Sequence, residues 1–213
     1  MLYTKDMFSN LSFGDIIAVV ISLLLSVGFH EAMHAFVAHR LGDNTAADQG
    51  RLTLNPLKHI DVYTTILLPT ILLLFHLPPI FIARPVPFDP SQVRYGEYGA
   101  ALMAVAGPVS NLVLATVAAL VLRFVPLDLS IIHILLLFMS VNIALFVFNM
   151  IPIPPLDGSR LLYAFAPEPV QRVMYQIESM GFMILIFIFL VLSPIISPVL
   201  SNINNAIATF LLS

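Results

Sequence analysis

The sequence predicts an all-α polytopic membrane protein with about four to six transmembrane helices. Of its 213 residues, 59% are hydrophobic and only 10% are charged, and the mean hydropathy is +0.98. Soluble domains carry about 25% charged residues, so most of this chain must face lipid or other apolar helices. The apolar residues are grouped in runs of roughly 20 residues, the length that a helix needs to cross a bilayer.

The first predicted helix covers about residues 12–41. Gly42 follows it, and glycine is the residue that most often terminates a helix. From Asp15 to Leu41 this helix would be about 40 Å long at 1.5 Å per residue, which exceeds the roughly 30 Å hydrocarbon core of a bilayer. His30, Glu31 and His34 come well before its end, so we expect these ionisable side chains to lie below the membrane surface at the Gly42 end.

The rest of the chain supplies further apolar segments. Residues 62–82 are apolar but interrupted by prolines, so this segment either crosses the membrane or dips in and returns as a short re-entrant or β-hairpin segment. Clearer spans are predicted at about 98–122, 130–151 and 179–200. Little sequence remains for an extramembrane module, so residues 1–213 are expected to form a single integral-membrane domain.

The basic residues favour one topology. If segment 62–82 crossed the membrane, the nine Lys and Arg residues would divide four against five, which is no bias. If it re-enters instead, seven share one side and only Lys5 and Arg123 lie opposite. The positive-inside rule prefers the second arrangement and places the Gly42 end of the first helix in the cytoplasm. The first and third spans would then be parallel.

A metal-binding pattern lies inside the first apolar segment. His30 and His34 are four residues apart, so on a helix they project from one face and can bind one Zn²⁺ together. Glu31 lies beside them, where it could act as a general base on a water molecule. The pattern H-E-x-x-H also occurs by chance in soluble helices. In an apolar span, however, such side chains need a partner and indicate a functional site.

The third metal ligand must come from another segment. Cysteine is absent, so only His, Asp or Glu can supply it. Asp157 is the best candidate, because the sequence Pro-Pro-Leu-Asp-Gly at 154–158 follows an apolar span and can unwind the backbone. The alternative is that Asp157 merely caps a helix starting near Ser159.

These motifs together resemble the site-2 protease family of intramembrane zinc metalloproteases. The resemblance rests on the H-E-x-x-H pattern and on Asn149-x-x-Pro-x-Pro-x-Leu-Asp-Gly, in the same order. The Gly-Pro-x-x-Asn pattern at 107–111 also looks like this family, and residues 51–59 look like its compact prokaryotic branch, which lacks PDZ and CBS modules. The resemblance implies one Zn²⁺ per chain, and it assigns the roles of five residues: His30, His34 and Asp157 as ligands, Glu31 as the base, and Asn149 as a group that holds the substrate or stabilises the oxyanion.

Three other polar residues are less specific. By the same resemblance His59 could approach the site as a gate or as a neighbour of a metal ligand, although a solvent-exposed loop residue is the simpler interpretation. Asn111 and Asn142 are interpreted as forming interhelical hydrogen bonds, which polar residues in spans commonly provide.

The resemblance implies a multi-pass cell-membrane protease that cleaves membrane proteins within or near a transmembrane helix, with its active site open toward the cytoplasm. Its partners would be that substrate and the lipid bilayer, with no nucleic acid. The alternative function is a proton- or metal-coupled transporter that uses the same His and Asp residues. A transporter would need polar groups near the middle of several spans, whereas here they are grouped toward one end.

Overall fold

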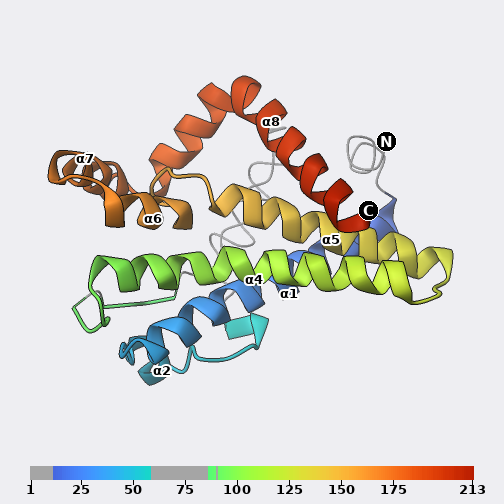
Figure 1. Ribbon diagram of the computed structural model, residues 1–213, viewed down its shortest axis with the longest axis horizontal. Coiled ribbons are helices and arrows are strands. Elements are labelled where there is room, and N and C mark those ends of the chain that lie inside the picture. Colours follow the sequence, from blue (N-terminus) through green and yellow to red (C-terminus); the bar gives the residue numbers. More distant parts are fainter. Residues whose placement is uncertain (1–11, 59–85, 90) are drawn as a thin grey trace.

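A computed structural model of the chain describes residues 12–58, 86–89 and 91–213, and these residues form helices and connecting turns with no strand among them. Three of the described helices are long and apolar enough to cross a membrane. They are α1 (Phe13–Arg40), α4 (Glu97–Phe124) and α5 (Leu129–Asn149). The prediction of an all-α polytopic membrane protein is therefore confirmed (Figure 1).

Local sequence signals define both ends of α1. Ser12 Oγ accepts a hydrogen bond from the Asp15 backbone N–H, and the Asp15 carboxylate accepts one from the Ser12 N–H, so the two residues form a capping box. At the other end Gly42 has a φ of 106°, a conformation that residues with a side chain rarely adopt. The helix thus ends within two residues of the predicted 12–41.

The helix α4 runs antiparallel to α1 and α5, which are parallel to each other. One end of the α1–α5 pair is marked by Asp15 and His133, whose side chains meet at 2.7 Å. The other end is marked by His30 and Asp157, which follows the end of α5. Small residues dominate the buried face of α4 and let its neighbours approach closely. They include Gly99, Ala100, Ala101, Ala104, Gly107, Ala115, Ala118 and Ala119.

Shorter helices lie at the ends of these spans. The helices α2 (Thr45–Asp48) and η1 (Pro56–Lys58) follow α1. The helices α6 (Asp157–Phe165) and α7 (Glu168–Ser179) follow α5 and lie together at one end of the molecule (Figure 1). Because α6 packs on α4, the start of α6 is held against the bundle.

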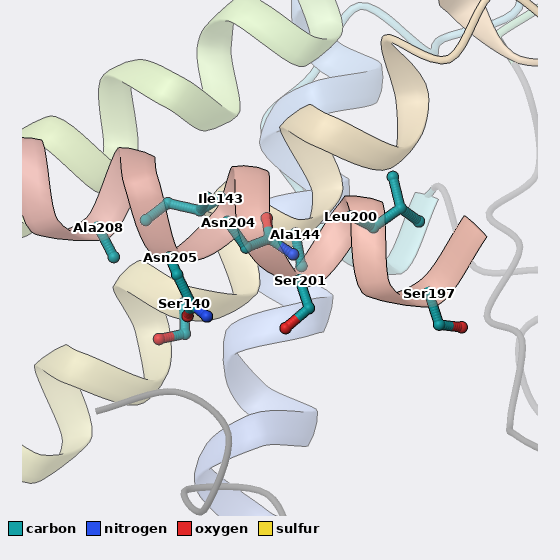
Figure 2. A pocket seen from close by; sticks show the side chains of 9 residues that line it. All are labelled: Ser140, Ile143, Ala144, Ser197, Leu200, Ser201, Asn204, Asn205 and Ala208. Carbon is teal, nitrogen blue, oxygen red and sulfur yellow. The ribbon is translucent and has the colours of Figure 1, made fainter. Parts of the chain in front are cut away.

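The last helix, α8 (Phe182–Leu212), differs from the predicted span at 179–200. It begins at Phe182 and continues 12 residues beyond residue 200, and Pro194 and Pro198 both lie inside it. Figure 1 shows α8 bent in its middle, where the prolines remove backbone hydrogen-bond donors. The second half of α8 packs on α5 across a cleft that is lined partly by polar side chains (Figure 2).

The predicted re-entrant or hairpin segment 62–82 and the candidate residue His59 lie outside the described residues.

Candidate metal centre

Two of the predicted ligands come from a single face of α1. His30 and His34 are both buried, with 6% of each residue exposed, and their Nε2 atoms lie 3.0 Å apart. This closeness follows directly from the four-residue spacing on a helix.

The start of α6 brings the third predicted ligand to the same point. Asp157 Oδ2 lies 3.1 Å from His30 Nε2 and 3.4 Å from His34 Nε2. Three atoms that each lie about 2.0–2.1 Å from one tetrahedral Zn²⁺ would be separated by about 3.4 Å. The three side chains therefore have the chemistry and the spacing of a zinc site, and they form the group that could hold a metal ion among the described residues.

The proton positions on the two imidazoles strengthen this conclusion. His30 Nδ1 faces the Asn111 Oδ1 atom at 2.6 Å, and His34 Nδ1 faces the backbone oxygen of Met103 at 2.8 Å. A carbonyl oxygen only accepts, so in each neutral imidazole Nδ1 carries the proton and Nε2 presents a lone pair. Asp157 Oδ2 is shielded from solvent and has no hydrogen-bond donor of its own. Three acceptor atoms that converge in this way repel each other unless a cation lies among them.

Gly107 of α4 leaves the space that the two predicted histidine ligands occupy. A Cβ atom at this position would lie 2.3 Å from His34 Nε2 and 2.7 Å from His30 Nε2. Both distances are far below van der Waals contact, so only glycine allows α4 to approach the two imidazoles this closely.

The structure contradicts the alternative role of Asp157 as a helix cap. Leu156 is the N-cap of α6 and no side chain caps this helix, while Asp157 is its first residue. Gly158 follows because a Cβ atom there would lie 2.3 Å from the Met150 backbone oxygen. The tight turn after α5 therefore directs the Asp157 carboxylate toward α1.

Glu31 lies on α1 beside the ligands and is not one of the three converging groups. Its Oε2 atom accepts a hydrogen bond of 3.0 Å from the backbone N–H of Val86. Sequence reasoning did not identify Val86, because a backbone donor leaves no signature in the residue type.

Asn149 is the last residue of α5, and its Nδ2 donates to the Leu145 oxygen one helical turn earlier at 3.0 Å. Among the described residues, its side chain forms no hydrogen bond or ion pair with His30, His34 or Asp157. Asn149 therefore lies at the end of α5, eight positions before Asp157 in the sequence.

Asn111 and Asn142 form interhelical hydrogen bonds, as predicted. Asn111 Nδ2 donates to the Ser26 backbone oxygen at 3.2 Å and to Asn142 Oδ1 at 3.0 Å. The prediction missed that the same Asn111 side chain contacts His30, one of the predicted ligands. The available signal was its place one helical turn after Gly107, within an otherwise apolar segment.

Comparisons with known proteins agree with this geometry. Residues 125–192, which include Asp157, match the family described as peptidase family M50. YwhC of Bacillus subtilis (strain 168), by name a candidate zinc metalloprotease, is 36% identical over 197 residues, or 88% of this chain and 86% of YwhC. Rip2 of Mycolicibacterium smegmatis, also a candidate zinc metalloprotease by name, is 28% identical over 184 residues, or 83% of this chain and 68% of Rip2.

Rip2 of Mycobacterium tuberculosis (strain H37Rv) is 29% identical over 182 residues, with 83% of this chain and 68% of that protein covered. No solved structure matches the chain significantly. The relationship to YwhC spans most of both proteins, so it includes the H-E-x-x-H helix as well as the Asp157 turn. The chain therefore belongs to peptidase family M50, the site-2 protease family of zinc metalloproteases.

Proposed function

We propose that this zinc metalloprotease hydrolyses peptide bonds within or near the transmembrane segments of membrane proteins, and that residues 1–213 act as one integral-membrane protease domain. The observation that carries the proposal is the convergence of His30, His34 and Asp157 between helices that are themselves long enough to span a bilayer. A site in that position is reached by a substrate that lies in the membrane.

The proposed chemistry divides the work among a few side chains. When bound by His30, His34 and Asp157, zinc would supply positive charge that acidifies a water molecule and polarises the scissile carbonyl. Glu31 would accept the proton of that water and pass it to the leaving amine. Its Oε2 is already held by the Val86 N–H, so Oε1 is the oxygen left to carry the proton.

Asn149 is proposed to donate a hydrogen bond to the oxyanion or to the substrate backbone. Its Nδ2 carries two hydrogens, of which one is used by the Leu145 oxygen. The second remains for a substrate atom, and one such donor contributes about 2.7–4 kcal/mol to a transition state of this kind.

The substrate would present a peptide bond that is normally protected. A transmembrane helix satisfies its own backbone hydrogen bonds, and lipid cannot replace them, so the substrate must unwind locally before it is cut. This requirement favours cleavage near helix ends or near helix-breaking residues.

The site is proposed to open toward the cytoplasm. Arg40 ends α1, Arg94 precedes α4, and Arg160 and Arg172 belong to α6 and α7, all at the end of the bundle where the ligands converge. Arg123 lies at the opposite end of α4. The excess of arginine at the ligand end supports a cytoplasmic orientation by the positive-inside rule.

The direct test compares the wild-type chain with Glu31→Gln, each purified and reconstituted with single-span model substrates. We expect bound zinc in both proteins but proteolysis only in the wild type, with a loss of about 10²–10⁴ in rate. Full activity of Glu31→Gln would refute the mechanism. Zinc or proton flux into proteoliposomes without any proteolysis would instead support the transporter alternative.

A further inference from the structure

We propose that Asn111 and Asn142 are positioning residues for the metal ligand His30. Through two consecutive hydrogen bonds they set the tautomer and the ring orientation that present His30 Nε2 to the metal. The inference rests on the zinc site of the proposed function, and it adds that the affinity of this site depends on side chains of α4 and α5 that never touch the metal.

The directions of the hydrogen bonds follow from two backbone carbonyls. Asn142 Nδ2 donates to the Phe138 oxygen at 2.9 Å, so Asn142 Oδ1 is the atom that faces Asn111. Asn111 Nδ2 donates one hydrogen to that Oδ1 and the other to the Ser26 oxygen. Asn111 Oδ1 is therefore the atom that faces His30, and as an acceptor it requires the proton on Nδ1.

Burial makes this arrangement hard to reverse. Asn111 and Asn142 are both 0% exposed, so water cannot replace a lost partner. If the Asn111 amide flipped, its Nδ2 would face the His30 N–H, and its Oδ1 would face the Ser26 oxygen and Asn142 Oδ1. One flip would therefore replace three hydrogen bonds with three like-against-like contacts, in a medium where unpaired polar groups are costly.

The two histidine ligands are held in different ways. His34 Nδ1 donates to a backbone oxygen, that of Met103, and no substitution can remove this acceptor. His30 depends instead on an amide side chain from α4, which a second amide from α5 orients. Partners of this kind typically change metal affinity by about 10–100-fold when they are removed.

A competing explanation is that the two asparagines only hold the helices together. The two explanations predict opposite orders for two substitutions at one position. Asn111→Leu keeps an apolar side chain of similar size but has no acceptor, whereas Asn111→Asp keeps an acceptor for the His30 N–H but buries a charge. A purely structural role therefore predicts that Leu is tolerated better than Asp, and a positioning role predicts tighter metal binding with Asp.

The experiment measures the zinc dissociation constant of the purified full chain by competition with a chromophoric chelator, and the visible spectrum after Co²⁺ replaces Zn²⁺. Asn111→Leu should weaken zinc binding about 10–100-fold and alter the Co²⁺ spectrum. Asn142→Leu should have a smaller effect, because Asn111 keeps its bond to Ser26. Asn111→Asp should bind zinc more tightly than Asn111→Leu, even if its melting temperature is lower.

Ser110→Ala is the matched control. Ser110 is buried on the same helix, and its hydroxyl donates to the Gly107 oxygen, a contact that does not involve His30. Wild-type zinc affinity is expected for this variant. The inference is overturned if Asn111→Leu binds zinc like the wild type, if Ser110→Ala loses as much affinity as Asn111→Leu, or if Asp binds more weakly than Leu. If the wild type itself binds no zinc, the proposed function fails rather than the positioning role alone.

Discussion

The backbone N–H of Val86 donates a 3.0 Å hydrogen bond to Glu31 Oε2, although 55 residues separate the two in sequence. A carboxylate that is held by one oxygen keeps a defined orientation, and its other oxygen stays available to accept a proton. The other end of the segment Val86–Asp89 is held by a second hydrogen bond, in which the Asp89 N–H donates to the buried carboxylate of Asp43 at 2.9 Å. The proposed base is therefore oriented by a segment that is anchored at the cytoplasmic end of α1 in the proposed topology.

Val86→Pro should lower kcat while zinc content stays at the wild-type level. Proline has no N–H, so the substitution removes the donor to Glu31. A hydrogen bond to a charged group contributes about 1.5–3 kcal/mol, which corresponds to about 10–100-fold in rate if the orientation of Glu31 is lost. Val86→Ala keeps the backbone donor and serves as the control. Equal activity of the two variants would show that the contact does not orient the base.

Gly107→Ala should abolish zinc binding and proteolysis together. The added methyl group would lie 2.3 Å from His34 Nε2, so the imidazole or α4 must move. Gly14→Ala is a suitable control, because its Cβ would meet only Ser12 Oγ at an ordinary 3.7 Å. Zinc content measured by elemental analysis of the purified proteins gives the result. Stoichiometric zinc in Gly107→Ala would contradict the close packing of α4 on the ligands.

Asp157→Asn should weaken zinc binding more than any substitution at Asn111. The amide keeps the size of the side chain but loses the negative charge that zinc favours in an oxygen ligand. Zinc affinity should fall by at least about 10–100-fold, the loss that is typical when a group hydrogen-bonded to a metal ligand is removed. Asp128→Asn, at the other end of α5 and without a side-chain capping bond, should bind zinc normally. Chelator competition on both proteins decides the matter, and unchanged affinity in Asp157→Asn would remove Asp157 from the ligand set.

Cysteine labelling can test the proposed orientation because the natural chain has no cysteine. Ser179→Cys is exposed at the end of α7, and Ser130→Cys is exposed in the first turn of α5. A membrane-impermeant maleimide added to intact cells should label Ser130→Cys and leave Ser179→Cys unlabelled until the cells are opened. The reverse pattern would place the zinc site on the extracytoplasmic side.

Much of the fold could be predicted because its signals are local. The apolar runs and the residues at their ends located α1, α4 and α5 to within two residues, and the capping box of Ser12 and Asp15 is formed by residues three positions apart. The predicted end of the last span, at about residue 200, was 12 residues too early, because polar residues from Ser201 to Asn205 interrupt the apolar run there. The helix α8 continues through them because its second half packs on α5.

The sequence by itself determined the pair of histidines, since a four-residue spacing places two side chains together on any helix. It also indicated Asp157 as the best candidate for the third ligand, but a local helix cap remained an alternative there. Only the tertiary structure brought the Asp157 carboxylate beside the two histidines, because its direction depends on how α6 packs against α4. The same holds for Asn111 and Val86: each contacts its partner across more than 50 residues of sequence, and such contacts depend on helix packing rather than on local spacing.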